Sequence, residues 1–387
     1  MKKTSFKHAE NFTDYFPLGL AKDKYFCNRV KEQELLKRYI ELVSHTVLVS
    51  PRRYGKSSLA IKTMENAKLP YEIIDLFVAR NAQTIEQYIV EGIQRLISKI
   101  MTAPKQMIKL LKTTLSHLDA KLVVGTNGLN LEFSRSSTDT AGNILEALQT
   151  LDTILIKNKK SAILFIDEFQ QIGALAACRG IEGALRHVAQ ETQHIIFIFS
   201  GSNRHLLTHM FHDSNRPFYK LCHEIKLQRI EAEDYTKYLN HVSQKSWGEN
   251  LPHEVLTEIF NCTERHPYYI NALCMKIWMY AQKPTPELVR QIWEEYVFEE
   301  RSKTINELND LTANQYFILN KIAYGHNTQL TSHVFLNEAK IPSASVIQAL
   351  AYLEKNDYIY KKESSYYLVD PLIKSSLLIF AKDTAAN

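Results

Sequence analysis

The sequence predicts an α/β protein in which a parallel sheet is followed by a helical unit and a small C-terminal domain. Continuous apolar runs at 162–166 and 194–199 alternate with helical patterns, as in strands that are buried on both faces of a parallel sheet. From residue 230 the apolar residues recur only with helical spacing. From residue 308, three helical segments precede two short strand-like segments. We therefore expect three domains in sequence.

Length and composition are those of an ordinary globular protein. The 387 residues suggest two or three domains, and the net charge of +5, from 47 basic and 42 acidic residues, permits contact with nucleic acid without arguing for it. The five cysteines form no C-x-x-C pair, so we expect reduced thiols. The first residues lack the apolar core of a signal peptide, and no apolar run could span a bilayer. These features predict a cytoplasmic protein without membrane contact.

The central motif is TVLVSPRRYGKSSL at 46–59, which indicates a strand, a tight turn and the start of a helix. In a phosphate-binding loop, G-x-x-x-x-G-K-[ST], the lysine reaches the β- and γ-phosphates, the hydroxyl binds Mg²⁺ and the helix dipole faces the anion. Ser50 replaces the first glycine, and serine is small enough to close the turn. The residues expected to bind ATP here are Ser50, Pro51, Arg52, Arg53, Tyr54, Gly55, Lys56, Ser57 and Ser58.

A second motif, AILFIDE at 162–168, is an apolar strand that ends in two carboxylates. Ligands of open α/β sheets bind at the carboxyl ends of the strands. We expect Asp167 to join Ser57 in holding Mg²⁺, and Glu168 to orient and deprotonate the attacking water. The alternative is a buried strand that ends in a solvated acidic pair. The two motifs together, in this order, predict nucleotide binding.

Three further side chains are candidates for contact with the γ-phosphate. Ser202 and Asn203 follow the strand at 194–199, where a polar group would lie beside the acidic strand, although turn-forming residues are also common at a strand end. Arg216 lies in the next loop and could neutralise γ-phosphate charge in its own subunit or in a neighbouring one. An ordinary surface arginine is the alternative.

Two regions flank these motifs. Residues 1–24 read as a polar arm, and Arg29, before a helix at 32–43, could contact the adenine or ribose or simply pack at the helix entry. Residues 102–140 read as an insertion with a basic helix at 106–118 and a hairpin that turns at Asn127-Gly128. The insertion could bind a partner, a second subunit or nucleic acid, or its basic face could be solvated.

The remaining elements of the domain at 25–229 follow from apolar spacing. We expect a helix from 57 to 65, a strand from 71 to 78 and helices over 86–101, 139–156 and 180–191, with Thr138 or Asp139 as a helix cap. Residues 230–304 carry helical patterns at 234–244, 253–263, 267–280 and 286–300.

Residues 305–387 are predicted to form a winged helix. Helices are expected at 313–323, 332–339 and 343–355, followed by a strand pair around 361–365. The third helix has no basic residue before Lys355, and only Lys361 and Lys362 in the wing could contact phosphates. We therefore expect DNA contact that is weak and insensitive to sequence.

Six motifs in order, PRRYGKSSL, FIDEF, FSGS, NRPFY, HPYY and YLVDP, resemble those of the archaeal-type P-loop ATPases of the STAND/AAA superfamily. The resemblance covers nearly the whole chain. It implies a P-loop NTPase sheet of the additional-strand (ASCE) type, with the acidic strand next to the loop strand, then a helical lid and a winged helix. It also implies ATP and Mg²⁺, with Lys56, Ser57, Asp167 and Glu168 in the roles given above.

The resemblance extends to residues outside the two main motifs. It implies that Ser202 or Asn203 acts as a sensor of the nucleotide, that Arg216 contacts the γ-phosphate, and that the lid contributes Pro267 to ATP binding. The lid departs from its relatives because Arg265 stands where they usually have glycine.

The expected function is an ATPase that acts as a nucleotide-dependent switch, with a protein partner or self-association. The alternative is a DNA-binding regulator or a replication or transposition factor whose shape ATP controls. A scaffold with a vestigial loop is a third possibility, but the retained acidic pair argues against it.

Overall fold

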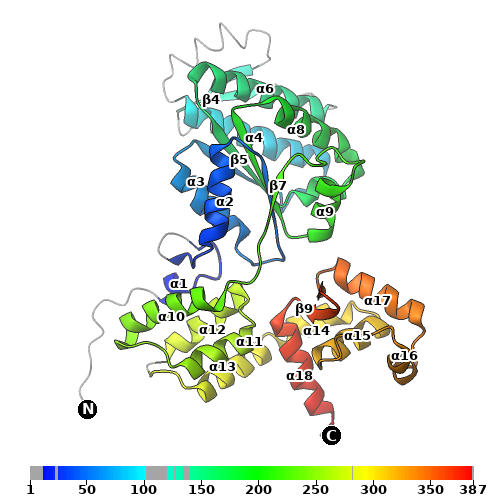
Figure 1. Ribbon diagram of the computed structural model, residues 1–387. Helices are drawn as coiled ribbons and strands as arrows, with labels where there is room; N and C mark the ends of the chain where they lie inside the picture. The colour runs from blue at the N-terminus through cyan, green and yellow to red at the C-terminus, as the bar shows by residue number, and fades with distance from the viewer. Residues whose placement is uncertain are drawn as a thin grey trace. The chain divides into compact units, whose positions relative to one another are not determined.

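The computed structural model describes residues 12–21, 25–101, 120–125, 128–133, 139–280 and 282–385 (Figure 1). The chain divides into two compact units. Arg29–Arg52 and Lys56–Leu227 form the first, here called the sheet unit; Arg53–Gly55 and the chain from Gln228 onward, with the residues before Arg29, form the second, here called the helical unit. The basic helix expected at 106–118 lies outside the described residues.

The sheet unit contains five parallel strands in the order β2-β5-β6-β1-β7. They are β1 (Thr46–Val49), β2 (Tyr71–Asp75), β5 (Ala162–Asp167), β6 (Ile195–Gly201) and β7 (His223–Lys226). The α/β fold class is therefore confirmed. All residues of β1 and β6 are buried, as expected for strands covered by helices on both faces.

One expectation about this sheet is wrong. The acidic strand β5 does not lie next to the loop strand β1, because β6 pairs with both and separates them. The most central position requires apolar side chains on both faces along the whole strand, and β6 is the longest strand in which every residue is buried. The end of β6 consequently lies between the phosphate-loop strand and the two carboxylates.

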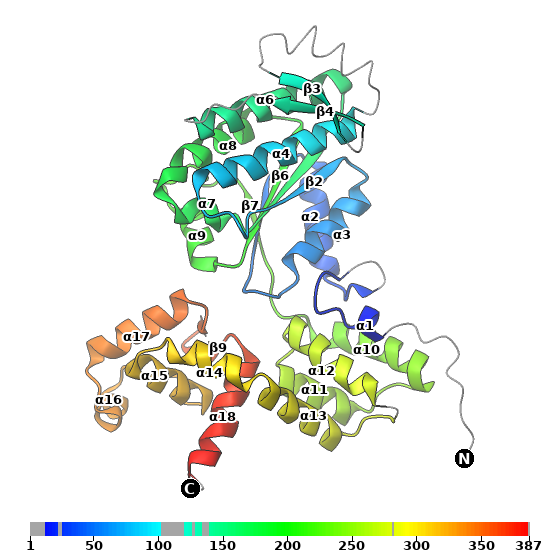
Figure 2. The same ribbon diagram turned by 180° about the vertical axis from the view of Figure 1, so that it is seen from behind.

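The helices of the sheet unit lie on both faces of the sheet. Figure 2 shows α4 (Ala82–Ile100), α6 (Thr140–Asn158) and α8 (Arg179–Glu191) across one face, with α2 (Val30–Glu41) and α3 (Lys56–Ala67) on the other. The short helices α7 (Gln170–Ala174) and α9 (Arg204–His212) follow β5 and β6, and neither helix was expected. In the core of this unit, the rings of Phe169, Phe199, Phe211 and Phe218 pack together.

Several boundaries differ from those expected because side chains cap or close the elements. Strand β2 ends at Asp75, whose carboxylate accepts a hydrogen bond from the Phe77 amide and so closes a turn. Helix α4 begins at Ala82 because Asn81 and Thr84 form a capping box. Asp139 caps α6, as expected for one of the two candidates.

A separate hairpin consists of β3 (Ala120–Gly125) and β4 (Gly128–Phe133). Gly125 pairs with Gly128, so Gly128 belongs to strand β4, whereas we had expected it to be a turn residue. A hairpin register of this kind is fixed by pairing along the whole of both strands rather than by one dipeptide.

The helical unit has two apolar cores. The first involves the short α1 (Phe12–Tyr15) and the helices α10 (Ala232–Trp247), α11 (His253–Thr263), α12 (Pro267–Met279) and α13 (Pro286–Glu299). The second joins α14 (Arg301–Asn309), α15 (Ala313–Ala323), α16 (His333–Ala339) and α17 (Ser343–Lys355) to the hairpin β8 (Ile359–Lys362) and β9 (Ser365–Leu368). The final helix α18 (Pro371–Ala385) was not expected.

Within the described part of the chain, no helix has both the length and the apolar character that crossing a membrane requires.

Candidate nucleotide-binding site

The loop between β1 and α3 encloses the ammonium group of Lys56. The residue is 7% exposed, and its Nζ donates hydrogen bonds to the carbonyl oxygens of Ser50 and Pro51, both at 3.1 Å, and to Ser50 Oγ at 3.3 Å. All three acceptors are uncharged. A phosphate oxygen at this position would add a negatively charged acceptor, and hydrogen bonds between charged groups are stronger than those to neutral acceptors.

The backbone of the loop explains which glycine the motif requires. Gly55 has a φ of 85°, in the left-handed region that glycine adopts without strain. Ser50, at the position of the missing first glycine, is not among the residues with positive φ. Its hydroxyl donates to the Pro51 carbonyl at 3.0 Å, so serine fits this position without backbone strain.

Asp167, the last residue of β5, accepts hydrogen bonds on both carboxylate oxygens. Ser57 Oγ donates to Oδ2 at 2.5 Å, while Ser200 Oγ and, at 2.9 Å, the Glu168 amide donate to Oδ1. Asp75 pairs with Asp167 in the sheet register. Burial raises the pKa of Asp75, and the carboxylates of Asp167 and Glu168 raise it further. Three acidic residues therefore gather at this edge of the sheet.

Glu168 follows the strand with a φ of 54°, in the left-handed region that non-glycine residues seldom adopt. Its Oε2 accepts hydrogen bonds from Ser202 Oγ at 2.9 Å and from Gln170 Nε2. The same serine hydroxyl accepts from Arg52 Nε and Gln170 Nε2, both at 3.5 Å. Glu168 is thus connected to the phosphate loop through a serine at the end of β6.

Comparison with solved structures gives a fold for this arrangement. A Walker-type ATPase of Pyrococcus abyssi has a TM-score of 0.67 and 17% sequence identity, over 94% of this chain and 99% of that chain. The ORC2 protein of Aeropyrum pernix, in ADPNP–ADP complexes, has a TM-score of 0.60 and 15% identity, over 98% and 99%. This chain has the P-loop ATPase fold.

Sequence comparison adds one domain to this result. Residues 305–378 match the family model described as "Probable winged helix domain". No curated protein sequence matches the chain. The resemblance noted in the sequence is therefore confirmed for the fold, which combines a P-loop ATPase sheet with a C-terminal winged helix.

In the P-loop ATPase fold, the predicted site residues divide into two groups. Ser57, Asp167, Glu168, Ser202 and Arg52 are connected as described above, and Lys56 lies directly before Ser57, hydrogen-bonded to Ser50 and Pro51. Asn203 instead caps α9, with its Oδ1 accepting from the Leu206 amide at 2.9 Å. Arg216 donates to Glu182 at 2.7 Å in a buried ion pair, and Arg29 pairs with Glu32 at 3.0 Å at the start of α2. The structure gives each of these three a local partner.

Sequence reasoning missed Ser200, Gln170 and Asp75. Ser200 was treated only as part of a strand-end turn, but β6 continues to Gly201 and places the serine beside Asp167. The sequence did contain a signal for Ser200, because this serine lies two residues before Ser202, on the strand next to the acidic strand. No spacing rule indicated Gln170, because a helix begins there rather than a loop.

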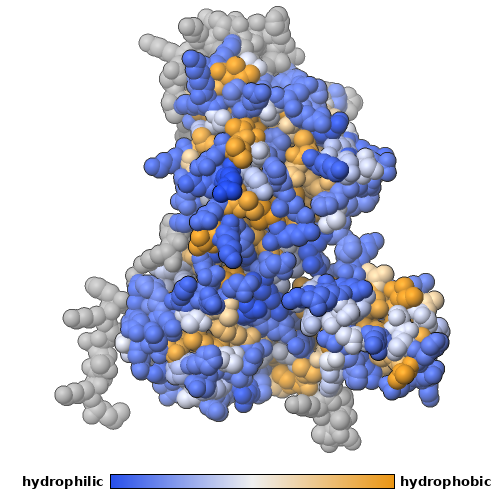
Figure 3. All heavy atoms as spheres, viewed as in Figure 1, coloured by the Kyte–Doolittle hydropathy of each residue, from blue (hydrophilic) through white to orange (hydrophobic). Residues whose placement is uncertain are grey.

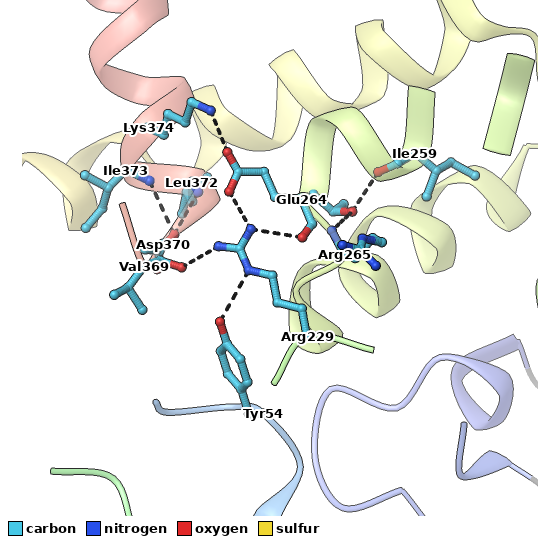
Figure 4. Close-up of polar contacts among 11 residues, drawn as sticks. Tyr54, Arg229, Ile259, Glu264, Arg265, Val369, Asp370, Leu372, Ile373 and Lys374 are labelled. Carbon is cyan, nitrogen blue, oxygen red and sulfur yellow. Dashed lines mark hydrogen bonds and ion pairs between the residues drawn. The ribbon is translucent and has the colours of Figure 1, made fainter. Parts of the chain in front are cut away.

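The tip of the loop, Arg53–Gly55, belongs to the helical unit. Arg53 lies over the ring of Tyr268, with its guanidinium carbon 4.0 Å from the ring centroid. The Tyr54 hydroxyl accepts from Arg229 Nε at 3.4 Å (Figure 4). Pro267, expected to touch ATP, starts helix α12 in this unit, and Arg265, two residues before it, has a φ of 60°.

Arg229 connects this loop tip to two distant segments. It donates to Glu264 Oε2 at 2.5 Å and to the Val369 carbonyl at 3.1 Å, and Lys374 donates to Glu264 Oε1 at 2.6 Å (Figure 4). Burial alone would raise the pKa of Glu264, but Arg229 and Lys374 hold it below its usual range. A charged network therefore joins the loop tip, the end of α11 and the start of α18.

Proposed function

We propose that this protein binds ATP with Mg²⁺ and hydrolyses it, acting as a nucleotide-dependent molecular switch. The observation that carries the proposal is the network at one edge of the sheet. There, Lys56 is enclosed by the phosphate loop, Ser57 contacts Asp167, and Glu168 contacts Ser202. The ADPNP–ADP complexes of the ORC2 protein from Aeropyrum pernix support nucleotide binding by a chain of this fold.

The residues at the site fit Mg²⁺, which prefers oxygen ligands and usually keeps several waters. Ser57 and Asp167 would hold the ion, since their side-chain oxygens already lie together. Among the described residues, no group of three His, Cys, Asp or Glu side chains could hold a metal. The remaining ligands would therefore be phosphate oxygens and water. Bound Mg²⁺ would neutralise charge on the transferred phosphoryl group.

Glu168 is the residue proposed to act as the base. Its Oε2 is held by Ser202 and Gln170, so Oε1 remains to accept the proton of the attacking water. The water oxygen forms a bond to the γ-phosphorus while the bond to the bridging oxygen breaks, which releases ADP and phosphate. Lys56 would exchange its loop carbonyl partners for phosphate oxygens when the nucleotide binds.

The winged-helix match at 305–378 favours a second candidate, a DNA-binding regulator whose conformation ATP controls. The two candidates differ in whether DNA changes the rate of hydrolysis, so the same assay distinguishes them.

The experiment is steady-state ATP turnover by the purified protein, with and without duplex DNA, alongside two variants. Lys56→Ala should abolish turnover and weaken binding of a fluorescent ATP analogue. Glu168→Gln should retain analogue binding while turnover falls by about 100-fold or more, since general-base catalysis typically contributes 10²–10⁴. Equal turnover by the wild type and Lys56→Ala would refute the ATPase proposal, and a rise with DNA would favour the second candidate.

A further inference from the structure

Gln170 lies at the start of α7, two residues after the proposed base. Its side chain is buried, with the residue 7% exposed, and its Nε2 donates to Glu168 Oε2 and to Ser202 Oγ, the latter at 3.5 Å. Its other polar atom, Oε1, is buried without a hydrogen-bond partner. A buried acceptor without a partner destabilises a fold, so a compensating role for this amide is expected.

The orientation of the Gln170 amide follows from its neighbours. A carboxylate oxygen can only accept, and the Ser202 hydroxyl already donates its proton to Glu168. Both neighbours therefore require a donor, so Nε2 must face them and Oε1 must point away. The unpartnered oxygen is a consequence of holding Glu168.

Gly201, the last residue of β6, makes room for this amide. A Cβ at Gly201 would lie 1.9 Å from Gln170 Oε1 and 3.0 Å from its Cδ. Gly201 is not among the glycines with positive φ, so backbone conformation does not require glycine here. What requires it is the close approach of the Gln170 side chain, which links the end of β6 to the proposed base.

We propose that Gln170 is a positioning residue for Glu168, and that the lack of a side chain at Gly201 makes room for the Gln170 amide. This inference rests on the hydrolytic function proposed above. Gln170 and Ser202 fix Oε2 of the carboxylate, which leaves Oε1 for the attacking water. A neutral amide suits this task, because it donates a hydrogen bond to Oε2 without adding a charge beside the proposed base.

The test uses the full-length protein and four variants. Gln170→Ala removes the amide that donates to Glu168, and Gly201→Ala displaces this amide without changing its chemical nature. Both should lower kcat by about 10–100-fold, as loss of a supporting hydrogen bond commonly does, with little change in KM for ATP or in the thermal midpoint. Gln171→Ala is the matched control, because the side chains that donate to Glu168 are those of Gln170 and Ser202, and the kcat of this variant should stay near that of the wild type.

Gln170→Glu provides a readout that a purely structural role would not move. Two carboxylates in contact cannot both ionise easily, so the acidic limb of the kcat–pH profile should shift upward by about one pH unit or more. The profile of Gln171→Ala should match that of the wild type.

The outcomes separate this inference from the function on which it rests. Turnover in the wild type but not in Lys56→Ala, with Gln170→Ala and Gly201→Ala at the wild-type kcat, would overturn the role of Gln170 and leave the ATPase intact. If Gln170→Ala and Gly201→Ala lowered kcat but the kcat–pH profile of Gln170→Glu did not shift, the positioning role of Gln170 would also be overturned. Absence of turnover above Lys56→Ala in the wild type would overturn both.

Discussion

At the scale of single residues, His266 is a buried imidazole in the helical unit. Its ring packs against Tyr54 and Tyr269, and its Nδ1 has no hydrogen-bond partner. Burial lowers the pKa of His266 to about 3, and the nearby Arg229 and Arg53 contribute to the shift. The ring is therefore neutral throughout the physiological range.

This pKa predicts how stability depends on pH. Between pH 6.5 and 3 the unfolded chain binds a proton at this histidine that the folded chain does not, so His266 lowers stability as the pH falls through this window. From pH 7.5 to 5.5 the expected loss is about 1.4 kcal/mol. Denaturant unfolding at both pH values should show that the free energy of unfolding falls by this much more in the wild type than in His266→Gln. Equal losses in the two proteins would contradict the prediction.

Motif spacing correctly placed Lys56 and Ser57 after a loop and Asp167 and Glu168 at a strand end, because local geometry sets these positions. Gln170 and Ser200 could not be found in this way. Their contacts with Glu168 and Asp167 depend on how α7 and β6 meet, and no sequence interval encodes that meeting.

At the scale of elements, the ion pair of Glu182 and Arg216 attaches the loop after α9 to helix α8. The Glu182 side chain is 1% exposed and that of Arg216 is 9% exposed. Burial raises the pKa of Glu182, and Arg216 opposes this shift. The sequence suggested a γ-phosphate contact for this arginine, whereas the structure gives it a structural partner.

Arg216→Ala should therefore destabilise the protein, because it leaves the Glu182 carboxylate buried without its partner. The free energy of unfolding should fall by about 3 kcal/mol, as when one member of a buried ion pair is removed. Arg186 is an exposed arginine on helix α8, the helix that carries Glu182. Arg186→Ala should change the free energy of unfolding by less than about 0.5 kcal/mol. Unchanged stability in Arg216→Ala with reduced ATP turnover would instead support the γ-phosphate role.

The helix and strand content was largely predictable, but the order of strands was not. Helices α11, α15 and α17 have the expected bounds, because apolar spacing is a local signal and, in α15, Thr312 and Gln315 also form a capping box. The edge strand β7 was missed because only one of its four residues is buried. Its strand character comes from pairing with β1 rather than from its own apolar pattern.

At the scale of the whole molecule, the winged helix exposes an apolar and neutral face. The exposed residues of α17 include Ala344, Ile347, Ala351 and Tyr352, and Val334 of α16 is 70% exposed. Figure 3 shows apolar patches over this domain, at the lower right. DNA-reading helices instead present base-contacting and phosphate-contacting polar side chains, most often arginine and lysine. This face is therefore poorly suited to groove recognition.

Binding to duplex DNA should accordingly be weak, with Kd no tighter than about 1 μM at physiological salt, the range of non-specific binding. Affinity should be similar for unrelated sequences and should fall steeply with added salt. The double variant Lys361→Ala/Lys362→Ala should weaken it further, because these are the exposed basic residues of the wing. Nanomolar, sequence-dependent binding in a gel-shift assay would contradict this prediction.

The sequence by itself determined the phosphate loop, the acidic strand end and the succession of sheet, helices and winged helix. These features depend on residue type and on spacing along the chain, which sterics and hydrogen bonding convert directly into local structure. Only the tertiary structure decided that β6 separates the loop strand from the acidic strand. It also decided that the Gln170 amide contacts Glu168 and lies against Gly201, and that Arg216 pairs with Glu182. These results depend on which buried groups find partners once distant segments pack together.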